Sequence, residues 1–149
     1  MPGLSFKPRF ERPIHVGTKR HTIRGNRKRP FREGDALFLW VSMRTKGRRF
    51  IGYTIARSVE DVAIDLDVVP GRLAITIDGQ RLSWDEANRL AVADGFRHLR
   101  EMHDFWMENN ALPFEGQIVH WFYPLRERPA TLKSRRKKGS IARKTLNPG

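Results

Sequence analysis

Runs of β-branched and aromatic residues, bounded by turn residues, mark out the strands of this chain. The segments ALFLWVSM, residues 36–43, and RFIGYTIARSVEDV, residues 49–62, are long and apolar, and we expect both to be core strands. The linker RTKGR supplies Gly47 for a turn, so the pattern predicts an antiparallel hairpin with a basic tip. The segment GQIVHWFYPL, residues 116–125, has the same character and predicts the last strand.

A weaker pair of strands follows the hairpin. Residues 72–78 and 80–82 flank Asp78-Gly79, a dipeptide that favours a tight two-residue turn. The sequence therefore predicts a small second hairpin inserted before the first helix.

Two helices are predicted after this insert. Ser83 and Glu86 have the spacing of a capping box, in which each side chain binds the backbone amide of the other residue, and Asp94-Gly95 ends the helix. A second amphipathic helix is predicted over 97–109, because apolar residues then recur at spacings of three and four. The positions in question are Phe96, Leu99, Met102, His103 and Trp106.

The balance of these elements favours an α+β domain with a curved sheet or small barrel, since strands outnumber helices. The length of 149 residues suits a single core, and we expect one domain over residues 1–125. Residues 126–149 contain almost no large apolar side chains, so burial cannot offset the entropy of ordering them. We expect this segment to be a disordered basic tail.

Charge is concentrated at the two ends of the chain. The formal net charge is +13, of which residues 1–34 and residues 126–149 carry +8 each, whereas residues 35–125 carry −3. Clustered cationic side chains attract a polyphosphate backbone through the release of counterions. A nucleic acid is therefore the expected partner, and a membrane is not, because neither basic end shows an amphipathic apolar stripe.

Other aspects of composition restrict the functional classes. The chain has no cysteine, and its five histidines show no metal-binding spacing, so we predict neither a disulfide nor a metal site, and no cofactor. There is no apolar run of the roughly 20 residues that a bilayer requires, and no secretory signal. We expect a cytoplasmic protein, and its compact size and Arg-rich composition favour a bacterial or phage origin. The sequence does not predict an oligomeric state.

The segment GTKRHTIR, residues 17–24, carries the candidate chemistry. Gly17 permits a turn, Lys19 follows it, and Thr22 and Arg24 project from one face of an extended backbone, with Ile23 on the core side. The same alternation points His21 away from Thr22. We expect a basic pocket here that engages a nucleic acid or a nucleotide-like ligand, with further basic residues beside it. These are Arg20, Arg27, Lys28 and Arg29.

The order of these motifs resembles that of the ASCH domains of the PUA-like superfamily. The matching stretches are GTKRHTIR at 17–24, EGDALFLW at 33–40, ADGF at 93–96, MHDFW at 102–106 and PFEGQIVHW at 113–121. The resemblance covers residues 10–123, and it implies a β-barrel-like sheet flanked by helices with a ligand cleft beside the Lys/Thr/Arg element.

The resemblance implies two functions. Some ASCH domains are RNA-binding modules, which makes RNA a more probable partner than DNA. Others are hydrolases, either amidohydrolases of N4-acylated cytidine or ribonucleases. In the amidohydrolase type a lysine acts as base on a threonine, which by resemblance assigns Lys19 as base, Thr22 as nucleophile and Asp94 to the acidic position, where the family has glutamate. Because aspartate is one methylene shorter than glutamate, we favour binding over catalysis.

Several further residues have two readings. Arg44 and Lys46 form either a solvated hairpin tip or a second phosphate contact. The tail run Arg135, Arg136, Lys137 and Lys138 is a candidate either for backbone binding or for a nuclear-type address. We interpret the large aromatic residues in the strand and helix patterns as core residues and not as platforms for stacked bases. They are Trp40, Phe50, Trp106, Trp121 and Phe122.

Overall fold

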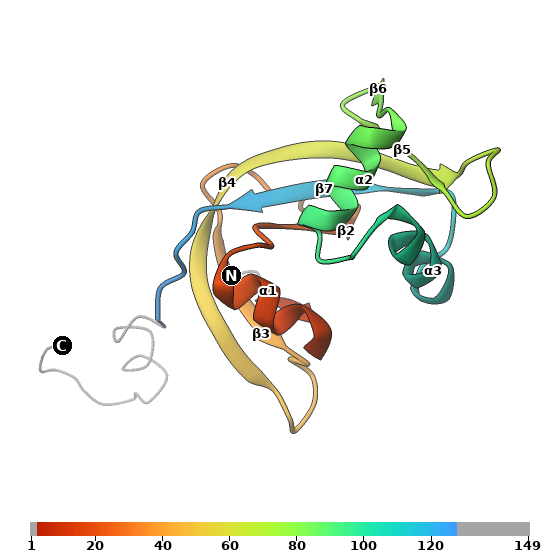
Figure 1. Ribbon diagram of the computed structural model, residues 1–149. Helices are drawn as coiled ribbons and strands as arrows, with labels where there is room; N and C mark the ends of the chain where they lie inside the picture. The colour runs from red at the N-terminus through yellow and green to blue at the C-terminus, as the bar shows by residue number, and fades with distance from the viewer. Residues whose placement is uncertain (1–2, 128–149) are drawn as a thin grey trace, which may run out of the picture.

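A computed structural model describes residues 3–127 of the chain, and the predicted tail therefore lies outside the described residues except for Arg126 and Glu127. The domain is of the mixed α+β class, as predicted (Figure 1). Its elements in chain order are β1 (Gly3–Phe6), the short 3-10 helix η1 (Pro8–Phe10), α1 (Glu11–Val16), β2 (His21–Gly25), β3 (Ala36–Val41), β4 (Arg49–Leu66), β5 (Leu73–Ile77), β6 (Gln80–Arg81), α2 (Trp84–Ala93), α3 (Leu99–Asn109) and β7 (Phe114–Trp121).

The long strand β4 organises the sheet. Its first half pairs antiparallel with β3, which pairs in turn with β1 in a parallel arrangement. Its second half lies between β7 and β5, and β2 and β6 extend these two sides. Register shifts interrupt the pairing at Leu39/Trp40 and at Ala56/Ser58, and such irregularities bend a strand. Figure 1 shows β4 following an arc along the whole molecule.

The sheet is open. Within residues 3–127, β2 pairs with β7 alone and β1 with β3 alone, so no backbone ladder joins these two edges. The expectation of a curved sheet is met, but a closed barrel is not formed by strand pairing. A side-chain contact spans the gap instead, because Nη2 of Arg24 donates a hydrogen bond of 2.9 Å to the backbone oxygen of Ser5.

The predicted strands are present with shifted ends. The β3–β4 hairpin and the β5–β6 hairpin both form, and Asp78 and Gly79 each adopt a positive φ, as a tight two-residue turn requires. β4 continues to Leu66, beyond the predicted end at residue 62, because β5 pairs with this extension. β7 begins at Phe114 and ends at Trp121, so the prediction of strand over 122–125 was wrong.

Both predicted helices form. The capping box of α2 is complete, since Glu86 N donates to Ser83 Oγ and Ser83 N donates to Glu86 Oε1. α3 begins at Leu99 and not at residue 97, because the side chain of His98 accepts a hydrogen bond from the amide of Glu101 and caps the helix there.

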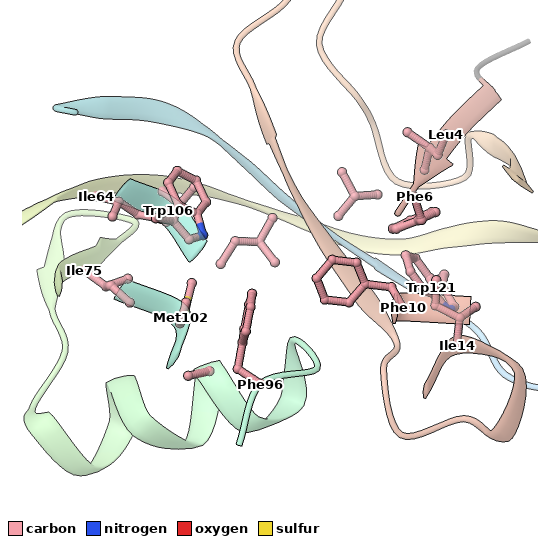
Figure 2. Packing of buried hydrophobic residues seen from close by; sticks show 14 of the residues in the cluster. Leu4, Phe6, Phe10, Ile14, Ile64, Ile75, Phe96, Met102, Trp106 and Trp121 are labelled. Atoms are coloured by element: carbon pink, nitrogen blue, oxygen red, sulfur yellow. The ribbon is translucent and has the colours of Figure 1, made fainter. Parts of the chain in front are cut away.

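The hydrophobic core runs along the concave side of the sheet as one continuous cluster (Figure 2). One end is packed around Trp121, and the other around Trp106 and Met102. Phe10 and Phe96 meet edge to face between these ends, with ring centroids 5.6 Å apart. This contact fixes the segment before α1 against the segment between α2 and α3, and the site described next lies beside it.

Candidate functional site

A turn after α1 directs the chain into β2. The carbonyl oxygen of Pro13 accepts hydrogen bonds from the amides of Gly17, Thr18 and Lys19, at 3.0 to 3.1 Å. Gly17 has φ +88°, a conformation that favours glycine, and a Cβ atom there would lie 2.6 Å from the ring of Tyr123. Only glycine fits both restraints, and the turn it forms places Lys19 inside the molecule.

Lys19 and Asp94 form a buried ion pair. The Nζ atom of Lys19 lies 2.5 Å from Oδ1 of Asp94 and donates a second hydrogen bond of 2.7 Å to the backbone oxygen of the same residue. Lys19 is 3 % exposed and Asp94 is 6 % exposed, and Nζ lies 5.0 Å from the centre of the Phe10 ring. The structure thus brings together two of the residues that the sequence assigned to one site.

Burial and mutual attraction act on the ionisation of this pair. Burial lowers the pKa of the Lys19 ammonium, and the cations Arg24 and Arg9 lower it further, against the opposing effect of Asp94. Burial by itself would raise the pKa of the Asp94 carboxyl, but Lys19 and His21 outweigh burial, and the net shift is downward. Asp94 is therefore a carboxylate at neutral pH.

Arg24 and Thr22, both on β2, form a second polar pair. Nε of Arg24 donates a hydrogen bond of 3.0 Å to Oγ1 of Thr22, and the guanidinium lies 4.8 Å from the centre of the Phe6 ring. Burial lowers the pKa of Arg24 to about 10, which leaves it charged at neutral pH. A guanidinium has five N–H donors, and Arg24 uses Nε and Nη2 for Thr22 and Ser5, so donors remain for a ligand.

Lys19 does not engage Thr22. Among the described residues, Nζ donates only to Asp94, and Oγ1 of Thr22 is paired only with Arg24. A base and its nucleophile need to lie within hydrogen-bond reach, at about 2.6 to 3.2 Å between heavy atoms. The structure holds Lys19 and Thr22 as members of two separate pairs, and the hydroxyl proton of Thr22 remains available to a ligand.

Both pairs open into one pocket of about 310 Å³. Lys19, Thr22, Arg24 and Asp94 supply its polar side, and aromatic rings from η1, α3 and the loop before α3 supply its apolar side. This combination of an aromatic wall with a few convergent polar groups is typical of sites for small organic ligands. The remaining lining residues are Ser5, Phe6, Lys7, Phe10, Ile23, Phe96, Phe105, Trp106, Asn109 and Asn110.

Sequence reasoning missed His21. Strand alternation does turn its side chain away from Thr22, as expected, but Asp94 lies on that side. Nε2 of His21 lies 3.0 Å from Oδ1 of Asp94, in a direction that does not complete a hydrogen bond. The available signal was a histidine directly before the motif threonine. Its role could be recognised only with the knowledge that α2 ends at Asp94.

Other pocket residues were also missed. Lys7 and Asn109 line the pocket although neither belongs to a recognisable motif. Arg9 lies close by, with its guanidinium 4.8 Å from the centre of the Phe96 ring and hydrogen-bonded to Glu101 at 3.2 Å. Lys7 and Arg9 lie at and within the short helix η1, which the hydrophobic pattern did not predict because it has only three residues, whereas Asn109 is the last residue of the predicted helix α3.

The other predicted basic residues lie outside the pocket. Arg20 is exposed, with its guanidinium 4.7 Å from the centre of the Tyr123 ring, and Arg27 lies similarly over Phe31 at 4.2 Å. Arg44 and Lys46 are exposed in the turn between β3 and β4, and Lys28 and Arg29 are exposed in the loop after β2. Arg135, Arg136, Lys137 and Lys138 lie outside the described residues.

The aromatic residues differ in their burial. Trp106 and Trp121 are core residues, as predicted, whereas Trp40 and Phe50 are only partly buried. The assignment of Phe122 to the core was wrong, because β7 ends at Trp121 and Phe122 is 53 % exposed.

Over residues 3–127, no three His, Cys, Asp or Glu side chains lie together as metal ligands would, and no helix is long and apolar enough to cross a membrane. The chain matches no protein-family model, no curated protein and no solved structure. The site must therefore be interpreted from its own chemistry.

Proposed function

We propose that the protein is a nucleic-acid-binding domain of the ASCH type, which holds one nucleotide of an RNA strand in the pocket and binds the strand's phosphates with its basic ends. The pocket carries this proposal. It places a charged guanidinium with uncommitted donors beside aromatic rings, and its volume of about 310 Å³ is at the small end of the range for ligand pockets.

The polar groups suit a nucleotide. Lys19 and His21 both contact Oδ1 of the Asp94 carboxylate, which leaves Oδ2 as an acceptor for an N–H group of a base. Arg24 and the hydroxyl of Thr22 supply donors for a base oxygen or a phosphate. Phe10, Phe96 and Phe105 offer apolar surface for the flat face of a base.

The distribution of positive charge favours a nucleic-acid strand over a free nucleotide as the ligand. Lys7 lines the pocket, and the exposed residues Arg27, Lys28 and Arg29 follow Arg24 along the chain. Ser5 connects the pocket with the basic turn after β3, because its hydroxyl accepts a hydrogen bond of 3.0 Å from the amide of Met43. A strand with one base in the pocket would therefore have Lys7 and these exposed cations as partners for its phosphates.

Fluorescence anisotropy with a short fluorescein-labelled single-stranded RNA of mixed sequence tests the proposal, with DNA of the same sequence for comparison. We expect the logarithm of the binding constant to fall linearly with the logarithm of the salt concentration. Arg24→Gln should weaken binding by about tenfold, which corresponds to the usual 1 to 3 kcal/mol for an arginine that recognises a base. The matched control is Arg97→Gln, which removes the same charge from a side chain that is 81 % exposed and outside the pocket.

Two results would overturn the proposal. One is the absence of RNA binding at low salt. The other is an equal loss of affinity in Arg24→Gln and Arg97→Gln, which would show that only total charge matters.

The second candidate function is a hydrolase of acylated cytidines or RNA, with Lys19 as base and Thr22 as nucleophile. The observation in its favour is that burial lowers the pKa of Lys19, as a lysine base requires. Catalysis would need Lys19 to leave Asp94 for Thr22 when substrate binds. Incubation with N4-acetylcytidine and with labelled RNA, with Thr22→Val as control, tests this candidate, and the lack of turnover on either substrate removes it.

A further inference from the structure

Two histidines lie side by side next to the pocket. His21 of β2 and His120 of β7 are directly opposite each other in the antiparallel ladder, and their ring centroids are 5.5 Å apart. His21 lies within the segment GTKRHTIR but is not one of its Lys, Thr or Arg residues, and the proposed function uses neither histidine.

Each histidine contacts a different carboxylate. His21 Nε2 lies 3.0 Å from Oδ1 of Asp94, and His120 Nε2 lies 2.6 Å from Oε1 of Glu60 in β4. Asp94 and His21 are buried, with side chains that are 8 % and 5 % exposed, whereas those of His120 and Glu60 are 22 % and 36 % exposed. The four side chains thus connect the polar end of the pocket with solvent.

The groups that face His21 set the effect of a proton on it. These groups are Asp94 at the end of α2, Lys19 before β2 and His120 on β7. Burial, which is the largest influence, lowers the pKa of His21, and Asp94 partly opposes this effect. The cations Arg24 and Arg9 lower the pKa of Lys19, which lies beside His21 and Asp94. A proton on one imidazole opposes a proton on the other, because the two like charges are close.

A protonated His21 would place a second cation beside Oδ1 of Asp94. With a neutral His21, the charges of Lys19 and Asp94 cancel, and Lys7 and Arg24 leave the pocket with a formal charge of two. Protonation adds one further positive charge and competes with Lys19 for the carboxylate. An anionic ligand is favoured by both changes, and by linkage the ligand then favours the protonated pair to the same extent.

We propose that His21 and His120 form a proton-sensitive pair that strengthens the binding of an anionic nucleotide in the pocket when the pH falls. This inference rests on the proposed function, because it concerns the regulation of the same pocket. The more exposed pair of His120 and Glu60 links the buried His21 to solvent, and a protonated His21 places its positive charge beside Asp94.

The test measures the affinity of the full chain for the same labelled RNA between about pH 5.5 and about pH 8 at constant ionic strength, the interval in which imidazoles titrate. We expect affinity to rise by about tenfold toward the acidic end, within the usual range for coupling between two sites. His21→Gln should abolish most of this rise. His120→Gln, which changes a more exposed side chain, should reduce it and guards against a folding defect in His21→Gln.

The matched control is His103→Gln, which removes a histidine that also contacts an aspartate, Asp104, at 2.9 Å but lies on α3. It should keep the wild-type pH dependence. If His21→Gln and His120→Gln instead keep the full rise, the inference is overturned while the proposed function stands. If RNA does not bind at any pH, the proposed function fails and the inference fails with it.

Proton NMR of the ligand-free protein supplies a readout that does not depend on RNA. The ring protons of His21 should follow its protonation, and His120→Gln, which removes a neighbouring imidazole that lowers the pKa of His21, should raise the midpoint of His21. An unchanged midpoint of His21 in His120→Gln would overturn the inference even if RNA binding proved sensitive to pH.

Discussion

Replacement of Asp94 by asparagine perturbs the centre of the site without changing its shape. The variant keeps a hydrogen-bond acceptor beside Lys19 but removes the negative charge from a group that lies 2.5 Å from Nζ. Lys19, which is 3 % exposed, would then be a buried ammonium without a counter-ion. We expect Asp94→Asn to be strongly destabilising.

The magnitude follows from two opposing effects. At an effective dielectric constant near 20, two unit charges at the observed distance attract by about 7 kcal/mol. Removal of the two ions from water costs several kcal/mol for each ion, so the intact pair is close to neutral in its net contribution. Loss of one partner leaves the other ion desolvated and uncompensated, for which the usual cost is about 3 to 5 kcal/mol.

A double-mutant cycle measures this coupling. Wild type, Asp94→Asn, Lys19→Met and the double variant are unfolded in urea and followed by the fluorescence of the buried residues Trp106 and Trp121. Each single variant should lose about 3 to 5 kcal/mol of unfolding free energy, and the double variant should lose much less than the sum of the two. Asp94→Asn should also recover stability at high pH, where Lys19 sheds its proton.

Simple additivity in this cycle would refute the reasoning. If the double variant loses the sum of the single losses, Lys19 and Asp94 do not act as a pair, and the buried charge would have to be compensated elsewhere. An unchanged stability of Asp94→Asn at neutral pH would have the same meaning.

Three further predictions concern stability. Burial lowers the pKa of His21, so the unfolded chain binds a proton at this histidine more readily than the folded chain, and the stability of the fold should decrease as the pH drops below about 6.5. Thermal melts should show a smaller decrease in His21→Gln than in wild type, and equal decreases would contradict the role of His21. Gly17→Ala should cost more than about 1 kcal/mol because of its left-handed backbone and the ring of Tyr123, and Tyr123→Leu should recover part of the loss; no recovery would exclude the clash. Ser83→Ala should lower unfolding free energy by about 1 kcal/mol through loss of the α2 cap, and an unchanged urea midpoint would show that the cap contributes nothing.

Local signals in the sequence predicted most of the fold. The turn at Asp78-Gly79 and the capping box at Ser83 depend on residues that are neighbours in the chain, and both form as predicted. The path of β4 was not predictable in the same way. Its length and bend result from pairing with three other strands, β3, β5 and β7, and a hydrophobic pattern carries no information about which strands pair.

The site was predictable only in part. Lys19, Thr22 and Arg24 lie close together in the chain, and their spacing indicated a common location. All three line the same pocket. The spacing did not indicate that Thr22 pairs with Arg24 while Lys19 pairs with Asp94. These contacts depend on where α2 ends, at Asp94, and on the position of Ser5 in β1, and neither can be read from the segment that contains Lys19, Thr22 and Arg24.

The pairing of β2 with β7 also sets the order in which the site is made during synthesis. His21 and His120, which face each other in the finished sheet, lie at opposite ends of the domain's chain. At the usual 5 to 20 residues per second, a ribosome adds the segment between them in roughly 5 to 20 s. Throughout that interval β2 lacks its strand partner. Asp94 and the α3 residues that line the pocket are also added late, so a product truncated before them would present GTKRHTIR without a complete pocket.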